Sequence, residues 1–186
     1  NIEKPILVAH SYGGLVLTKF LEDKKNKDLI SGAIWLSSIP PSGEKSLRTR
    51  FFFRIKVLKI LLEVLKGEFD TDIGRQRQIF YDKNTLSSKI EKYTERLKLD
   101  SMIGLNLSSI NNNLPNKDNF EKDEIKKLVI GSYNDFIVDR FSVHETAKVI
   151  NSPFPIFLKE SGHNMMLGSS WVEASLEILN FINECF

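Results

Sequence analysis

The feature that most constrains the fold is a change of hydrophobic period near the start of the chain. Residues 5–9 (PILVA) are a short, continuous apolar run, typical of a strand buried on both faces in a parallel sheet. From Gly14 onward the apolar residues instead follow helical spacing, at Leu15, Val16, Leu17, Phe20 and Leu21. The chain therefore passes from a buried strand into a helix with almost no loop, and Ser11 stands on that turn.

A turn this tight restricts the side chains around Ser11. Its backbone is expected to be strained at the apex, so close neighbours must be small. Ala9 and Gly13, two positions before and two after the serine, meet that need, and Gly14 follows. A phosphate-binding or purely structural glycine turn is the alternative, but a serine centred between strand and helix favours a reactive hydroxyl.

The turn also gives its backbone and side chains chemical roles. A free serine is a weak nucleophile and must hand its proton to a base as it attacks. The turn lifts the Ser11 Oγ toward a histidine arriving from elsewhere. It places the backbone N–H of Tyr12 at a helix N-terminus, where it can donate to an oxyanion. His10, inside the turn, is expected to point away from Oγ and to be structural.

Residues 9–13 (AHSYG) resemble the G-x-S-x-G nucleophile elbow of the α/β-hydrolase superfamily, with Ala9 in the first glycine position. Three further segments, 29–43, 145–157 and 161–182, are similar to a lid-bearing branch of that superfamily. The resemblance is strong over residues 5–43 and 125–183 and faint between them. It implies an α/β fold, the C-terminal part of a mostly parallel sheet flanked by helices, with a helical lid insertion.

The same resemblance implies a catalytic triad in the chain order Ser, acid, His. Asp135 stands in a polar turn directly after an expected strand at 127–131. Asp139 lies four residues on, where it could cap the helix beginning near Phe141. Asp135 is therefore favoured as the triad acid, with Asp139 as the alternative.

The histidine is chosen from only three in the sequence. His163 follows the last expected strand, at 155–159, after a turn that presents its ring. His144 falls on the helix after Asp135 and is expected to be a packing or surface residue. In a triad, a carboxylate on Nδ1–H fixes the tautomer so that Nε2 serves as the base. The predicted triad is Ser11, Asp135 and His163.

The chain divides into a hydrolase core at residues 1–40, a helical lid insertion at 41–122 and the rest of the core at 123–186. Within the insertion, residues 48–69 are strongly amphipathic, and further helices are expected at 86–97 and from Asp100. Lid side chains expected to contact substrate are Phe51, Phe52, Leu58 and Leu62. Because the first lid helix is also basic, peripheral contact with an anionic membrane is an alternative role for it.

Composition excludes several function classes. The net charge of +2, with 27% charged residues, gives no global argument for binding nucleic acid. Three scattered histidines and one cysteine, Cys185, cannot build a zinc site of usual spacing. The sequence shows neither a phosphate loop nor a dinucleotide fingerprint, so no cofactor is expected. It leaves the compartment open, with the cytoplasm slightly favoured.

The position of the elbow predicts that this sequence is the C-terminal portion of a longer chain. In complete members of the superfamily the elbow follows the fifth strand, whereas here its strand begins near residue 6. A natural minimal hydrolase, or one completed by a second polypeptide, is the alternative. The preceding segment normally donates a second oxyanion N–H, and losing one such donor lowers turnover by about 10²–10³.

The sequence therefore predicts a serine hydrolase that cleaves carboxylic esters through an acyl-enzyme, with lipid and lysophospholipid-type esters among the candidate substrates. Ser11 attacks the carbonyl, His163 transfers the proton, Asp135 orients His163, and the Tyr12 N–H stabilises the oxyanion. The alternatives are thioester hydrolysis, C–C bond hydrolysis or lyase chemistry by the same triad, and a catalytically inactive binding module.

Overall fold

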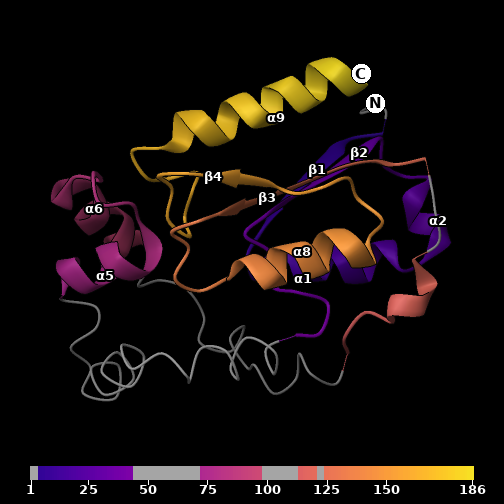
Figure 1. The fold of residues 1–186 in the computed structure, drawn as a ribbon, viewed down its shortest axis with the longest axis horizontal. Coiled ribbons are helices and arrows are strands. Elements are labelled where there is room, and N and C mark those ends of the chain that lie inside the picture. Colours follow the sequence, from indigo (N-terminus) through magenta and orange to yellow (C-terminus); the bar gives the residue numbers. More distant parts are fainter. Residues whose placement is uncertain (1–3, 44–71, 98–112, 121–123) are drawn as a thin grey trace.

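The computed structural model describes residues 4–43, 72–97, 113–120 and 124–186. Within these ranges four parallel strands form one sheet in the order β1-β2-β3-β4 (Figure 1). The strands are β1 (Ile6–His10), β2 (Gly32–Leu36), β3 (Lys126–Ser132) and β4 (Ile156–Leu158). The predicted mostly parallel sheet is confirmed.

Helices cover both faces of this sheet. In Figure 1, α1 (Tyr12–Leu21) and α8 (Arg140–Val149) lie below the sheet, and α9 (Trp171–Cys185) lies above it. The shorter α2 (Lys24–Lys27) and the 3-10 turn η2 (Lys117–Asn119) are connectors. Two helices, α5 (Ile73–Phe80) and α6 (Ser87–Leu97), pack together beyond the carboxyl ends of the strands.

The core has one apolar layer on each face of the sheet because side chains alternate along a strand. In β2, Ala33 and Trp35 belong to the layer shared with α1 and α8. Ile34 and Leu36 belong to the layer under α9. All four are buried, which explains why β2 is a continuous apolar run without polar alternation.

Trp35 fixes the start of α1 against β2. Its indole Nε1–H donates to the carbonyl of Gly14 at 3.1 Å and to the hydroxyl of Thr18 at 3.0 Å. Two backbone hydrogen bonds hold Ser11. Its N–H donates to the carbonyl of Leu36 at 3.0 Å, and its carbonyl accepts from the N–H of Ile39 at 3.0 Å. The turn at Ser11 is therefore part of the rigid core.

Of the two glycines predicted to belong to the turn, Gly14 and not Gly13 is the one that must be small. A Cβ added at Gly13 would meet nothing within 4 Å among the residues described. A Cβ added at Gly14 would lie 2.2 Å from the Ser38 Oγ and 2.5 Å from its Cβ. The prediction for Gly13 was wrong on this point, because the close approach is between α1 and the end of β2. Ala9 packs at the margin of the core layer beside α1.

We expect Gly14→Ala to lower the free energy of unfolding by about 2–3 kcal/mol, since overpacking of a tight core contact has this size. Gly13→Ala is the matched control, because Ala replaces Gly in a helix with open space around it and should be neutral or stabilising by up to about 1 kcal/mol. Urea unfolding of both variants measures the difference. Equal stability of the two variants would contradict the packing described.

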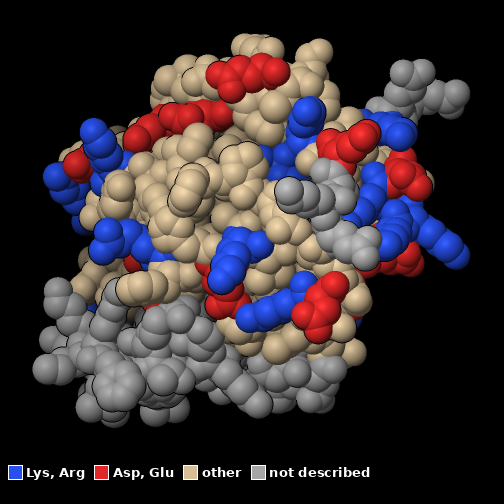
Figure 2. Space-filling model, turned by 45° about the vertical axis from the view of Figure 1, so that its right-hand side comes forward, with Lys and Arg blue, Asp and Glu red and all other residues tan. Residues whose placement is uncertain are grey.

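The helix predicted at 86–97 and the strands predicted at 127–131 and 155–159 are present, with no end shifted by more than one residue. Neither α2 nor α5 was predicted. The amphipathic segment 48–69 and the helix predicted from Asp100 lie outside the described residues, and the domain boundaries at 41 and 122 stay predictions. None of the helices described is long and apolar enough to cross a membrane. On the face shown in Figure 2, acidic and basic side chains are interspersed.

Candidate active site

Ser11 sits at the junction of β1 and α1 with a strained backbone. Its φ is 53° and its ψ is −120°, a conformation that a residue with a side chain seldom adopts. Ser11 is also the N-cap of α1, where a serine usually turns its hydroxyl to cap the helix, but here no such bond forms. The strained turn instead directs Oγ to the Nε2 of His163, 3.0 Å away.

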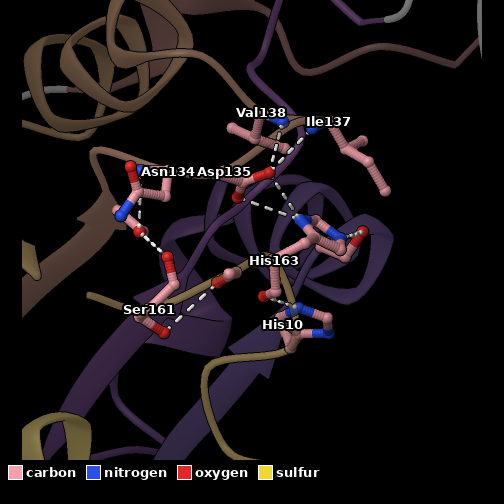
Figure 3. Close-up of polar contacts among 10 residues, drawn as sticks. His10, Asn134, Asp135, Ile137, Val138, Ser161 and His163 are labelled. Atoms are coloured by element: carbon pink, nitrogen blue, oxygen red, sulfur yellow. Dashed lines mark hydrogen bonds and ion pairs between the residues drawn. The ribbon is translucent and has the colours of Figure 1, made fainter. Parts of the chain in front are cut away.

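The other ring nitrogen of His163 faces Asp135. His163 Nδ1 lies 2.9 Å from Oδ2 and 3.1 Å from Oδ1 of the carboxylate (Figure 3). Both side chains are almost fully buried, 4% exposed for the histidine and 0% for the aspartate. One hydrogen-bonded chain therefore runs from Ser11 through His163 to Asp135, and the structure brings together the three residues predicted as a triad.

The carboxylate of Asp135 is stabilised in its charged form. Its Oδ1 also accepts from the backbone N–H groups of Ile137 at 2.8 Å and Val138 at 2.9 Å (Figure 3). Burial alone raises the pKa of the Asp135 carboxyl, but His163 and the Val138 N–H outweigh that effect and hold the pKa below its usual value. Asp135 can therefore stay ionised while it orients the imidazole.

The turn that carries Asp135 is tied to the loop that carries His163. Ser132 Oγ donates to the carbonyl of Ser161 (Figure 3). The side-chain amide of Asn134 donates to the carbonyl of Lys159 at 2.7 Å. These bonds join the ends of β3 and β4 just before the acid and just before the histidine. The two side chains are thus positioned by a shared polar network.

Asp139, the alternative candidate for the triad acid, caps a helix as its position in the sequence suggested. Its carboxylate accepts from the N–H of Ser142 at 2.9 Å and from the hydroxyl of Ser142 at 2.9 Å, at the start of α8. His144 is an exposed residue of α8 whose ring lies 5.2 Å from that of Phe157. Of the candidate acids and histidines, His163 is the one hydrogen-bonded to Ser11 Oγ, and Asp135 is the one hydrogen-bonded to His163.

His10 contacts the backbone of His163. Its Nε2–H donates to the carbonyl of His163 at 3.0 Å, and the two ring centroids are 4.7 Å apart (Figure 3). Burial, together with the neighbouring His163 imidazole, lowers the pKa of His10 from 6.5 to about 4. His10 is neutral near pH 7, so it supports His163 without adding a second positive charge.

This low pKa predicts a pH dependence of stability. Because folding disfavours protonated His10, its contribution is complete above pH 6.5 and is lost as the pH falls toward about 4. Between about pH 7 and about pH 4.5 the loss should be roughly 2.5 kcal/mol. His10→Gln keeps an N–H donor but does not titrate. Over the same pH range, the free energy of unfolding of this variant should therefore fall by roughly 2.5 kcal/mol less than that of the wild-type protein. Urea unfolding measures both, and parallel pH profiles would contradict the assignment.

The Tyr12 N–H is in the position expected of an oxyanion donor. Tyr12 is the first residue of α1, where no preceding helical carbonyl is available to accept from its N–H. The positive end of the helix dipole adds to the same effect. The four predicted lid contacts, at Phe51, Phe52, Leu58 and Leu62, lie outside the described residues.

Sequence reasoning missed the contact between the last residue of α5 and the residues around His163. The ring of Phe80 lies 6.4 Å from the ring of His163, and the carbonyl of Phe80 accepts from Asn164 N–H at 2.7 Å. Nothing in the local pattern marks this contact, since α5 is short, polar and far from His163 in sequence. Among the residues described, no group of three His, Cys, Asp or Glu side chains could hold a metal ion.

Comparison with solved structures places this geometry in a known fold. The chain is similar to a bromoperoxidase from Bacillus anthracis (15% identity, TM-score 0.69) over 98% of this chain and 68% of that one. It is also similar to a thermophilic esterase from Thermogutta terrifontis (15% identity, TM-score 0.68), over 98% of this chain and 66% of that one. A third similar structure is the 2-hydroxy-6-oxo-6-phenylhexa-2,4-dienoate hydrolase of Rhodococcus sp. strain RHA1 (14% identity, TM-score 0.66), over 98% of this chain and 65% of that one.

The chain spans about two thirds of the length of these structures. No protein-family model and no curated protein sequence matches it. The similarity extends over almost the whole chain, and it includes enzymes with different reactions on one architecture. A parallel sheet with helices on both faces, a strained serine after β1 and these structural neighbours agree: this chain has the α/β-hydrolase fold.

Proposed function

We propose that this chain carries the catalytic site of a serine hydrolase that cleaves carboxylic esters. The observation that supports the proposal most is the continuous chain of hydrogen bonds from Ser11 Oγ to His163 Nε2 and from His163 Nδ1 to the buried Asp135. A serine in this arrangement has both a base for its proton and a fixed acceptor behind the base.

The reaction follows from the positions of the three side chains. Ser11 Oγ attacks the ester carbonyl while its proton passes to His163 Nε2, and Asp135 stabilises the imidazolium that forms. Collapse of the tetrahedral intermediate breaks the C–O bond, and His163 gives the proton to the leaving alcohol. Water then attacks the acyl-enzyme with the same base, which releases the acid and regenerates Ser11.

The Tyr12 N–H serves as an oxyanion donor in this scheme. It heads α1 next to the nucleophile, so it can donate to the carbonyl oxygen as negative charge develops there. No cofactor enters any step. We also propose that the substrates include lipid-like esters and that the lid contacts a membrane surface. Both proposals depend on the residues predicted to form the lid.

Related reactions are the second candidate. The same fold is found in proteins described as an esterase, a bromoperoxidase and a meta-cleavage product hydrolase. Since a fold hosts many reactions, the ester substrate is inferred from the triad chemistry and not from these neighbours. A serine nucleophile hydrogen-bonded to a histidine base is well suited to acyl transfer.

Hydrolysis of p-nitrophenyl esters of increasing acyl length tests the proposal. We expect a burst of p-nitrophenolate that approaches one equivalent of enzyme, because an acyl-enzyme accumulates before water cleaves it. The dependence on acyl length reports the pocket that the predicted lid residues would line. Ester cleavage at the same rate in Ser11→Ala, or none by the folded wild-type protein, would overturn the proposal.

A further inference from the structure

Residues 80–82, which are the last residue of α5 and the two that follow it, contact the histidine loop (residues 159–170) on both sides of His163. Asn164 N–H donates to the carbonyl of Phe80 at 2.7 Å. On the other side, a Cβ added at Gly162 would lie 2.5 Å from the backbone carbon of Tyr81 and 2.6 Å from its oxygen. The backbone of residues 80–82 therefore lies directly against the residues that flank the triad histidine.

Asp82 extends this contact to the end of the histidine loop. Its carboxylate accepts from Ser169 N–H at 2.8 Å and from Ser169 Oγ at 2.5 Å. In the turn that follows α5, it also accepts from Thr85 Oγ1 at 2.9 Å and from Asn84 N–H at 2.9 Å. A Cβ added at Gly168 would lie 2.3 Å from Oδ2, so the loop backbone packs closely on the carboxylate.

Asp82 is suited to hold this loop as an ionised carboxylate. It is only 4% exposed. Burial raises the pKa of the carboxyl, but the hydroxyl and N–H groups of Ser169, Thr85 and Asn84 outweigh it and leave the pKa below its usual value. An ionised carboxylate accepts from all these donors at once, whereas a carboxamide would turn an N–H₂ toward some of them.

The histidine loop needs such support because its own backbone has no regular structure. Residues 159–170 form no helix or strand in the structure, yet His163 must stay 3.0 Å from Ser11 Oγ and 2.9 Å from Asp135 at the same time. One side of the loop is tied to the acid turn through Ser161 and Lys159. The other side is tied to residues 80–82.

We infer that Asp82 is a positioning residue for the hydrolytic reaction: it fixes the histidine loop so that the His163 ring stays aligned between Ser11 and Asp135. The inference rests on the proposed function. It implies that α5 and the turn after it form a fixed wall of the site, although they lie within the region predicted as a lid. Asp82 touches none of the reacting groups and acts through Ser169 and the loop.

The first readout is the second-order rate of labelling of Ser11 by a fluorophosphonate, measured well below the unfolding temperature of every variant. We expect Asp82→Asn to lower this rate about 10–100-fold, since a misplacement near 1 Å can lower reactivity about 10²-fold. Thr85→Val, which removes one donor to Asp82 and keeps the side-chain volume, should give a smaller loss in the same direction.

Glu22→Gln is the matched control. Glu22 also joins distant segments through several bonds, accepting from Asn119 Nδ2 at 2.9 Å and Asn116 N–H at 3.3 Å, and its pKa is likewise lowered by its partners against the opposing effect of burial. It lies at the far end of α1 from Ser11. Its substitution should lower stability without changing the labelling rate. If Asp82→Asn and Glu22→Gln left the rate equally unchanged, the positioning role would be wrong.

The second readout does not depend on activity. A proton held between His163 Nδ1 and Asp135 gives a strongly downfield ¹H NMR signal, which Asp135→Asn assigns by abolishing it. We expect this signal to be shifted or lost in Asp82→Asn and unchanged in Glu22→Gln. A wild-type protein that shows the signal but does not react would overturn the proposed function alone. A signal unaltered by Asp82→Asn would overturn the positioning role alone.

Discussion

His163→Ala is expected to lower ester turnover by about 10⁶-fold, a loss as large as that expected on removing the Ser11 hydroxyl itself. His163 is the group placed to accept the Ser11 proton, at 3.0 Å, and the same group must return a proton to the leaving alcohol. Without it neither half of the reaction has a base or an acid. Steady-state hydrolysis of a p-nitrophenyl ester measures the loss.

His144→Ala is the control for this substitution. His144 is exposed on α8 and is not part of the hydrogen-bonded chain at Ser11. Its removal should leave turnover within about twofold, as is usual for a surface side chain. Comparable losses in the two variants would mean that the His163 ring is not the base.

Asp135→Asn is expected to lower turnover by about 10⁴-fold with little change in KM. The carboxylate accepts from His163 Nδ1–H at 2.9 Å, whereas an amide nitrogen there would donate toward Nδ1. The ring would then carry its proton on Nε2, and Nε2 could no longer accept from Ser11. Turnover therefore falls because Asp135→Asn stabilises the tautomer of His163 that cannot act as a base, even where the ring stays in place.

Asp139→Asn separates this effect from a general effect of removing a carboxylate nearby. Asp139 caps α8 through Ser142, and Asn is also a good N-cap, so stability should change by less than about 1 kcal/mol. Turnover should stay within a few-fold of the wild-type value. If Asp139→Asn were as severe as Asp135→Asn, the assignment of the triad acid would have to be reversed.

The sequence was sufficient to predict the residues that meet at the site because their signals are local. The apolar run into Ser11, the polar turn after the strand at 127–131 and the turn before His163 each reflect a strand end. Their order along the chain was predicted from the resemblance to the α/β-hydrolase superfamily, and the three residues meet because the carboxyl ends of parallel strands lie at one edge of a sheet. The distances of 3.0 and 2.9 Å confirm that the three side chains are together.

What the sequence could not predict depends on contacts between distant segments. The close approach at Gly14 comes from Ser38, which no local pattern places there. The bond from His10 to the His163 carbonyl joins residues 153 positions apart. The anchoring of the histidine loop by Asp82 depends on a short polar helix whose sequence has no strong apolar period. Each of these contacts is fixed by packing and not by intrinsic propensity.

The most direct test of the central claim is intact-mass analysis of the chain after reaction with a fluorophosphonate probe, with Ser11→Ala alongside. Such probes react with a serine that a neighbouring base has activated. The Ser11–His163–Asp135 geometry predicts a single adduct on the wild-type protein and none on Ser11→Ala. A folded wild-type protein that forms no adduct, or an adduct that persists in Ser11→Ala, would contradict the claim that Ser11 is an activated nucleophile.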